Sequence, residues 1–492
     1  MRPPSTAPSV LTAAVARWAA GIVAAAACAA TVGFALGTLS SRPLDGTEGH
    51  LLFDASRIRD HLRLYVDPFE GAWSYGPVPS RTYVLHTPLW AAVLSLLPAS
   101  MAAPIARALC IGAWLGLLAG IAWSARPGNR GVAWLGALFL GGAYPLTLFA
   151  AAGRHDAPAL LLAGVALLRS MRRGRAGALE GALFALAAFL KPNVVGAGAG
   201  VLACTLVTRG RSSPSRESGP ALAGLAAVTT ACVLGLQVAS DGAWVHHLVA
   251  STQTTPMLGL WLDQMASRLP FFALPLAAAL GVAWRGRFTR AGRVGLWALL
   301  ASTAWTIVSL AKVGSASNYW MEPCVVALAI ASLTPLPAWG PRAALAASGA
   351  ALLQASWVGT AAIRSSWEGV TRAPRQAAML ADAREACGAG RDDVVIADEA
   401  GIEMMLNGRA IQMPFVMTRL ARDGRYPLAL WQADVRRASV RCLVMQSDLL
   451  ERPPEQVDVA ADLFDPAMRQ TLRERFALVQ SRDGLWIYGL RR

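Results

Sequence analysis

Long apolar runs, separated by short arginine-rich stretches, make up the chain between residues 18 and 361. A helix needs about 20 apolar residues to cross the hydrocarbon core of a bilayer; several runs reach that length and others are shorter. The pattern predicts an α-helical polytopic membrane protein with about 11 to 13 transmembrane helices. The runs cover residues 18–39, 104–125, 131–152, 157–169, 177–190, 193–208, 220–239, 270–284, 294–311, 320–337 and 342–361.

Four arginine clusters interrupt these runs, and two runs separate each cluster from the next. Because Lys and Arg are enriched in cytoplasmic loops, all four clusters can face the cytoplasm together. With the N-terminus also inside and 18–39 kept as an uncleaved first span, the tail is extracytoplasmic and the protein belongs in the plasma (inner) membrane. The clusters are Arg126 and Arg130; Arg169, Arg172, Arg173 and Arg175; Arg209, Arg211 and Arg216; and Arg285, Arg287, Arg290 and Arg293.

The apolar segment 88–98 does not fit this alternation. A full crossing there would reverse the side of every later loop, so that the arginine clusters would no longer share the cytoplasm. We therefore predict an interfacial or re-entrant helix.

Composition supports the membrane assignment. Hydrophobic residues make up 55% of the chain and charged residues 15%, which is not the composition of a soluble globular protein. The net charge of +15 does not indicate nucleic acid binding, because the basic residues lie in short clusters between apolar runs.

The sequence predicts two parts: a membrane part, residues 1–364, with a long first outer loop at 40–87, and an extracytoplasmic soluble α/β domain, residues 365–492. The second part has ordinary globular composition, with strand-like runs at 394–397, 442–445 and 485–490. It contains no recognisable catalytic motif, so we expect it to recognise an acceptor or to cover a membrane site. Cys387 and Cys442 could form a disulfide.

Acidic residues gather on the predicted outer side. Of the twelve before the tail, ten lie there, although carboxylates contribute little to membrane orientation, so an outward-facing polar site is indicated. The only two lysines, Lys191 and Lys312, also lie at the outer edge, and an ammonium group suits a phosphate. The ten acids are Asp45, Glu48, Asp54, Asp60, Asp67, Glu70, Asp156, Asp241, Asp263 and Glu322.

Asp45 and Glu48 are the candidate catalytic residues. They open the first outer loop directly after the first span, so their carboxylates would lie near the lipid headgroups, where a general base could act on an acceptor. A solvated acidic loop is the alternative. Aromatic residues farther along the loop, such as Tyr83, are expected at the membrane surface, either as anchors or as faces for sugar stacking.

Three short outward segments supply the candidate substrate-binding residues. Arg154 would bind phosphate, with Asp156 contacting sugar hydroxyls or orienting a base; the alternative is an ion pair that stabilises the turn. Lys191 would likewise bind phosphate. Asn193 can be explained by the geometry of the turn alone, without a role in function. The full candidate set is Arg154, His155, Asp156, Lys191, Asn193, Asn318, Tyr319 and Glu322, of which the last three could be interfacial anchors.

No cofactor is expected, and a divalent metal ion is the alternative. His246 and His247 form an adjacent pair in the loop 241–268, but one pair does not supply the ligands of a zinc site.

In the order of these motifs, and in their location on one side of the membrane, the chain resembles the GT-C superfamily of membrane glycosyltransferases. These enzymes use polyprenyl-phosphate-linked sugars, and the resemblance is strongest to the family 39 and aminoarabinose-transferase-like members. The motifs that carry the resemblance are Asp45-x-x-Glu48, Gly153-Arg154-His155-Asp156, Leu190-Lys191-Pro192-Asn193 and the segment from Gly314 to Glu322. The likeness covers essentially the whole membrane part and, more loosely, the tail.

The resemblance implies that Asp45 is the catalytic carboxylate, with Glu48 as its neighbour. This sequence lacks the commoner adjacent Asp-Glu pair, so the choice between the two stays open. Lys191 and Arg154 would face the lipid phosphate, and Asp156 would line the same cavity. The implied partners are a polyprenyl-phosphate sugar donor and a glycan, lipid or protein acceptor in the cell envelope.

Three other functions remain as alternatives. A secondary transporter would place ionisable groups near the middle of the bilayer and often shows repeated halves, which this sequence does not. A glycan polymerase or ligase with a diphosphate-linked donor differs only in its donor, and a noncatalytic assembly subunit would lack transfer altogether.

Overall fold

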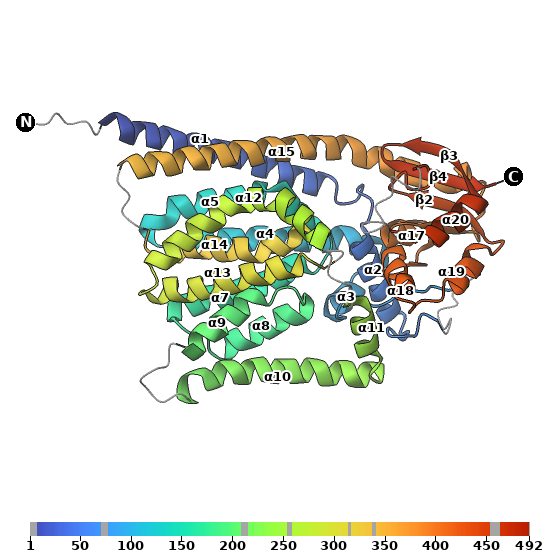
Figure 1. Ribbon diagram of the computed structural model, residues 1–492, viewed down its shortest axis with the longest axis horizontal. Helices are drawn as coiled ribbons and strands as arrows, with labels where there is room; N and C mark the ends of the chain where they lie inside the picture. The colour runs from blue at the N-terminus through green and yellow to red at the C-terminus, as the bar shows by residue number, and fades with distance from the viewer. Residues whose placement is uncertain are drawn as a thin grey trace, which may run out of the picture.

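The computed structural model of the chain describes residues 7–69, 77–207, 215–252, 258–312, 316–336, 341–452 and 463–491. Every predicted apolar run coincides for most of its length with helix of one elongated bundle, and the run 131–152 is divided between two helices (Figure 1). These helices are α1 (Ala7–Gly37), α4 (Ala102–Trp123), α5 (Arg130–Gly142), α6 (Tyr144–Ala151), α7 (Asp156–Arg173), α8 (Ala178–Leu190), α9 (Gly196–Val207), α10 (Ser215–Ser240), α12 (Leu258–Arg285), α13 (Arg290–Ser309), α14 (Met321–Leu333) and α15 (Pro341–Ala381).

Among the described residues, five helices are long and apolar enough to cross a membrane, or six if α5 and α6, which meet at 69°, form one broken span. The five stretches are Thr12–Gly37, Ala99–Trp123, Gly219–Ser240, Leu258–Arg285 and Arg290–Ser309. Helices α8 and α9 are apolar but have only 13 and 12 residues, about 20 Å, against a hydrocarbon core of about 30 Å. The architecture is therefore that of a polytopic helical membrane protein, and the number of 11 to 13 crossings stays a prediction.

Small residues allow the helices of the bundle to approach closely, as is usual in membranes. A Cβ added to Gly181 would lie 2.0 Å from the backbone oxygen of Ala221, which joins α8 to α10, and one on Gly200 would lie 2.3 Å from the oxygen of Trp297, which joins α9 to α13. Glycine is therefore required for these backbone contacts.

Helix α15 links the two parts of the molecule. It lies beside α1 and continues into the C-terminal domain (Figure 1), and a Cβ on Gly369 would meet the Phe34 ring at 2.5 Å. Its 41 residues extend about 60 Å, more than a bilayer requires. The expected domain boundary between residues 364 and 365 falls inside this unbroken helix, so the two parts share one long element.

The C-terminal domain is a small α/β unit, as predicted. Its four-stranded sheet has the order β1-β2-β4-β3, with β1 (Val394–Ala397) parallel to β2 (Val440–Met445) and antiparallel pairs elsewhere. The Cys387–Cys442 disulfide ties β2 to the segment before β1. The other elements are α16 (Ala383–Ala386), α17 (Ala400–Asn407), α18 (Pro414–Arg422), α19 (Leu428–Val435), α20 (Pro466–Arg475), β3 (Phe476–Arg482) and β4 (Leu485–Leu490).

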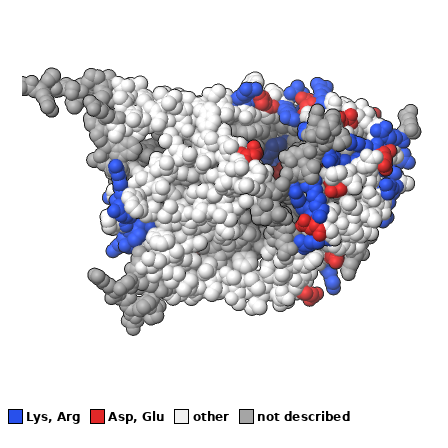
Figure 2. Space-filling view, viewed as in Figure 1, with Lys and Arg blue, Asp and Glu red and all other residues white. Residues whose placement is uncertain are grey.

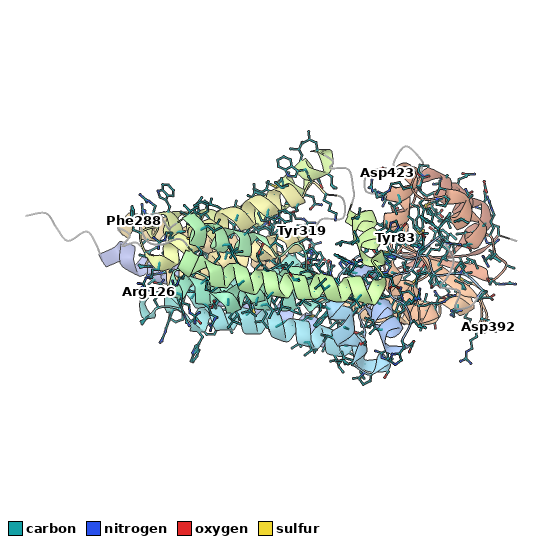
Figure 3. The ribbon with its side chains drawn as sticks, turned by 90° about the horizontal axis from the view of Figure 1, so that it is seen from below. Tyr83, Arg126, Phe288, Tyr319, Asp392 and Asp423 are labelled. Atoms are coloured by element: carbon teal, nitrogen blue, oxygen red, sulfur yellow. A yellow bond between two sulfur atoms is a disulfide. The ribbon has the colours of Figure 1, made fainter. Side chains whose placement is uncertain are left out.

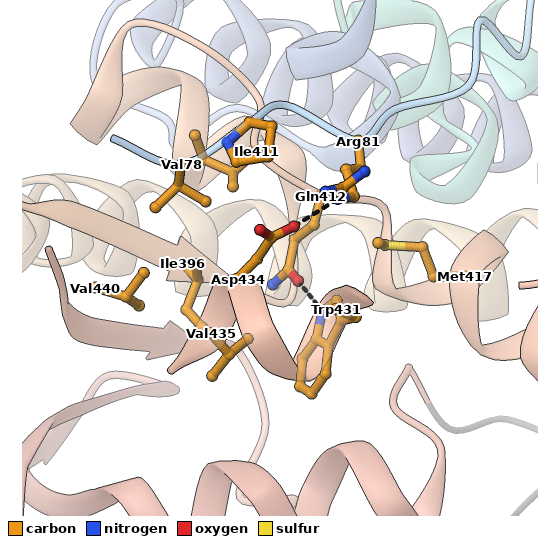
Figure 4. Close-up of a pocket in the computed structure, with 11 residues that line it drawn as sticks. Val78, Arg81, Ile396, Ile411, Gln412, Met417, Trp431, Asp434, Val435 and Val440 are labelled. Atoms are coloured by element: carbon orange, nitrogen blue, oxygen red, sulfur yellow. Dashed lines mark hydrogen bonds and ion pairs between the residues drawn. The ribbon is translucent and has the colours of Figure 1, made fainter. Parts of the chain in front are cut away.

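The first outer loop is largely enclosed by protein. It contains helix α2 (Gly46–Arg59), and its later residues join the core of the C-terminal domain. Val78 and Arg81 line a cavity of about 10 Å³ in that domain, room for about one water, and Arg81 pairs with Asp434 of α19 (Figure 4). The expectation that Tyr83 lies at the membrane surface is wrong, because its side chain is buried in the same core.

The segment 88–98 forms only the seven-residue helix α3 (Leu89–Ser95), about 10 Å long and too short to cross a bilayer. The 3-10 turn η1 (Ala99–Met101) then leads into α4, and α11 (Ala243–Thr252) contacts the loop before α3 through His247 and Val84. This length agrees with the prediction that the segment does not cross the bilayer, and the alternation of the loops stays a prediction.

On the face shown in Figure 2, charged side chains gather at the two ends of the molecule, and the visible surface between them is largely uncharged. Arg126 and Phe288 lie at one end and Asp392 at the far end of the C-terminal domain (Figure 3). Arg126, Arg172 and Arg290 line one pocket, so three of the four predicted arginine clusters meet at the same end of the bundle. In the fourth cluster, Arg209 and Arg211 lie outside the described residues.

Candidate functional site

Asp45 begins helix α2 at the end of the bundle that meets the C-terminal domain. Its Oδ1 accepts the backbone N–H of Glu48 at 2.7 Å, and the Glu48 carboxylate accepts the N–H of Asp45 at 3.4 Å, which is a capping box. The Asp45 side chain is 42% exposed, so a substrate can reach its carboxylate even though the cap fixes its position.

Glu48 is instead enclosed. Both of its carboxylate oxygens accept hydrogen bonds from Arg107 of α4, at 2.6 and 2.7 Å, and Oε1 also accepts the N–H of Gly153 at 2.9 Å. Its side chain is 1% exposed. Burial alone would raise the pKa of Glu48, but the hydrogen bonds from Arg107 hold it below its usual value. Glu48 therefore connects α2, α4 and the turn before α7. Asp45 is the accessible carboxylate of the pair.

Arg107 extends this junction to the end of α1. Its guanidinium also donates to the backbone oxygens of Leu39, Arg42 and Pro43 at 2.7 to 3.2 Å. All five guanidinium donors can be used in such an arrangement, which explains why a fully buried charge is tolerated. The sequence alone did not single out Arg107, because it lies inside an apolar run.

Arg154, Asp156 and Lys191 form one buried ionic cluster beside Asp45. The Asp156 Oδ1 lies 3.2 Å from Nζ of Lys191, and its Oδ2 lies 3.3 Å from Nε of Arg154. Arg154 also reaches Asp45, with Nη1 and Oδ2 3.7 Å apart. The structure therefore brings together the predicted cations from two turns and the first-loop carboxylate.

Asn318 completes the contacts of Asp156. Its side-chain amide donates to Oδ1 of Asp156 at 2.8 Å, which joins the short turn η3 (Ser317–Trp320) to the start of α7. Gly314 and Ser315, the first residues of that predicted motif, lie outside the described residues.

Glu322 and His155 lie in the packing behind the ionic cluster. The Glu322 carboxylate accepts the backbone N–H groups of Gly196 and Ala197 at 3.1 and 3.0 Å, which matches an anion to the positive end of α9. His155 is fully buried, with its ring centroid 4.4 Å from that of His86. Burial and the His155 ring lower the pKa of His86, which favours neutral imidazole.

Asn193 and Tyr319 contribute backbone oxygens to the local structure. The Asn193 oxygen accepts the indole N–H of Trp305 at 3.1 Å, and the Tyr319 oxygen accepts the hydroxyl of Thr306 at 2.9 Å. Tyr319 lies on the bundle, apart from Tyr83 on the side of the C-terminal domain (Figure 3).

Glu399 is a site residue that the sequence did not single out. It immediately precedes α17, and the N–H of Gly46 donates a hydrogen bond to its carboxyl group. Burial raises the pKa of Glu399 to about 8, and the carboxylates of Asp398 and Asp45 act in the same direction. The acidic pair Asp398-Glu399 directly after the predicted strand 394–397 was the only sequence signal for it.

Close backbone packing places Glu399 there. A Cβ on Gly49 would lie 2.4 Å from the backbone of Gly401, and one on Gly401 would lie 2.1 Å from the oxygen of Leu44. Only glycine permits the starts of α2 and α17 to touch in this way, so the C-terminal domain supplies a carboxyl group to the site in the membrane part.

Within the described ranges, no three His, Cys, Asp or Glu side chains lie close enough together to hold a metal ion. Of the adjacent pair considered for zinc, His247 instead accepts the backbone N–H of Val84 through Nδ1 at 3.0 Å, which fixes the first outer loop to α11.

No family model and no curated protein matches the chain. Among solved structures, the chain is similar to ArnT from Cupriavidus metallidurans in the apo state, with 13% sequence identity and a TM-score of 0.54. The chain has a GT-C-like fold. The likeness covers 93% of this chain and 96% of ArnT, so the GT-C-like fold includes both the helical bundle and the C-terminal domain.

Proposed function

We propose that the protein is a membrane glycosyltransferase that moves a sugar from a polyprenyl-phosphate donor to an extracytoplasmic glycan, lipid or protein acceptor. The observation that carries the proposal is the meeting of an accessible, positioned Asp45 with Arg154, Asp156 and Lys191 where the C-terminal domain joins the bundle. The GT-C-like fold supports the same class of enzyme. The protein would act in the inner membrane with this end facing outward.

In the proposed reaction, the acceptor hydroxyl oxygen forms a bond to the anomeric carbon while the bond from that carbon to the phosphate oxygen breaks. Asp45 accepts the hydroxyl proton, and polyprenyl phosphate leaves with the electron pair of the broken bond. The contact of Asp45 Oδ2 to Arg154, at 3.7 Å, is longer than the other ion pairs of the cluster, so Oδ2 is left available to a bound acceptor while Oδ1 caps α2.

Arg154 and Lys191 would stabilise the negative charge that develops on the departing phosphate. Asp156 contacts both cations and would hold them in place before the donor binds. This arrangement is preorganised, because the cationic atoms need little movement when the charge develops.

Glu399 would keep the site from accumulating negative charge. With a pKa of about 8 its carboxyl group is largely protonated at neutral pH, so it adds little negative charge beside Asp45. The proton on Glu399 also offers a hydrogen bond to a sugar or phosphate oxygen.

The direct test supplies the purified protein, in lipid nanodiscs, with labelled polyprenyl-phosphate sugars and acceptor mixtures from the cell envelope. We expect label to move to an acceptor from a monophosphate donor and not from the matching diphosphate donor. Transfer only from the diphosphate would favour a polymerase or ligase, and no transfer from any donor by folded protein would overturn the proposal.

A further inference from the structure

A second polar feature lies at the arginine end of the bundle, away from the site around Asp45. There, four parts of the chain line an open cavity of about 440 Å³. They are the end of α4, the end of α7, the start of α13 and the segment after α14. The residues that line the cavity are Ser124, Arg126, Met171, Arg172, Thr289, Arg290, Ala291, Leu333 and Pro335.

The charge around this cavity has a single sign. Arg126, Arg172 and Arg290 line it, and none of its described lining residues is acidic. The nearest carboxylate along these connections, Glu180, is held by Arg169 and Arg173 at 2.7 and 3.1 Å. Three guanidinium groups around a hollow whose described lining residues include no carboxylate favour an anionic ligand.

Buried hydrogen bonds and close packing hold the walls of the cavity. The Asn129 side chain donates to the backbone oxygens of Ala331, Ser332 and Thr334 at 2.7 to 3.2 Å, which fixes the turn containing Arg126 to the end of α14. A Cβ on Gly174, whose φ is +77°, would lie 3.0 Å from the Arg290 side chain. The end of α7 and the start of α13 are therefore in contact.

The surroundings place the cavity at the level of lipid headgroups. Trp123 and Phe288 flank it in sequence and are 80% and 83% exposed, and Trp284 is 56% exposed. Tryptophan side chains concentrate at membrane–water interfaces, so Trp123 and Trp284 mark the boundary of the bilayer. Phe288 and Arg126 lie at the same end of the molecule (Figure 3).

We propose that this cavity binds the phosphate headgroup of an anionic membrane phospholipid. Arg126, Arg172 and Arg290 would contact the phosphate oxygens, and Met171 and Leu333 would line the path of the first apolar carbons. Cytoplasmic orientation alone accounts for the presence of arginines, but not for a hollow that three of them share. The position among exposed aromatics selects a lipid over a free phosphate as the source of the anion.

The test uses the full chain in neutral nanodiscs and measures bound lipid by native mass spectrometry during titration with phosphatidylglycerol, with phosphatidylcholine as the neutral reference. We expect specific binding of phosphatidylglycerol and a roughly hundredfold loss of affinity in the triple variant R126Q/R172Q/R290Q. A rise in unfolding temperature on addition of phosphatidylglycerol should likewise disappear in that variant.

The matched control is the triple variant R130Q/R285Q/R287Q, which removes the same charge from the same end but not from the cavity. The control should bind phosphatidylglycerol like the wild type. Equal loss in both variants would show that general charge alone attracts the lipid and would overturn the proposal. Binding of inorganic phosphate that displaces phosphatidylglycerol would assign the cavity to a soluble anion and would overturn it too.

Discussion

The two charged ends of the bundle are built on opposite principles. Around Asp45, Arg154, Asp156 and Lys191, each buried charge lies within 4 Å of an opposite one. At the other end, three arginines share a cavity in which no described lining residue is acidic. Paired charges hold reactive groups in defined positions, whereas charges of one sign remain available to an anion from the lipid. Charged side chains thus hold reactive groups in place at one end of the bundle and attract an anionic lipid at the other.

The largest effect is expected from Asp45→Asn. The amide keeps the size and the helix cap but cannot accept a proton, so turnover should fall by about two to four orders of magnitude with an unchanged unfolding temperature. Transfer of labelled sugar and thermal unfolding measure the two quantities. The exposed Asp60→Asn at the end of α2 is the control and should retain activity. Full activity in Asp45→Asn would remove the base assignment.

Next comes Arg107→Ala, which leaves the buried Glu48 carboxylate unpaired. The expected cost is roughly 3–5 kcal/mol of stability, since an uncompensated buried charge is strongly destabilising. Replacing both partners, as in Glu48→Leu with Arg107→Leu, should recover much of the loss. Arg364→Ala, at an exposed ion pair with Glu368, should not change the unfolding temperature. Comparable losses in all three variants would contradict the special role of this pair.

A smaller effect concerns pH and the C-terminal domain. Burial raises the pKa of Asp398 to about 7 and that of Glu399 to about 8, both above their unfolded values of 3.8 and 4.5. At these two positions the folded state therefore holds protons that the unfolded state releases, so the stability that these two groups contribute is fully present below about pH 4 and is lost as the pH rises to about 8. Unfolding midpoints between pH 4 and 9 should follow this slope.

Glu399→Gln should make that pH dependence shallower, because the amide does not titrate. The exposed Glu474→Gln on α20 is the matched control and should keep the wild-type slope. An identical slope in Glu399→Gln and in the wild type would show that this carboxyl group is ionised in the folded protein across the range.

The smallest effect is expected at the arginine end. Arg126→Gln removes a charge from a surface where it has no acidic neighbour among the cavity residues, so stability should change by no more than about 0.5 kcal/mol. Thermal unfolding in neutral nanodiscs measures it. A loss as large as that of Arg107→Ala would mean that the two ends are not built differently.

The helices, the strands and the side on which the arginines gather could be predicted from the sequence, because the signals for them are local. Apolar runs predict helices, arginine between the runs predicts a common side, and the runs 394–397, 442–445 and 485–490 lie in the strands of the C-terminal domain. The contacts of Arg154, Asp156 and Lys191 agree with the prediction that polar turns from separate connections meet at one end. The hydrophobicity and charge of a segment determine whether it forms a buried helix or an exposed loop largely independently of distant segments. These features can therefore be predicted without knowledge of the fold.

The tertiary structure decided which of the candidates are accessible and which are enclosed. Glu48 is buried because Arg107 lies opposite it, 59 residues away in the chain, and Asp45 stays accessible three residues earlier. Glu399 reaches the site only because Gly46, Gly49 and Gly401 allow two helix starts to touch. Such pairings depend on the close approach of distant segments, and no local pattern of residue types encodes that distance.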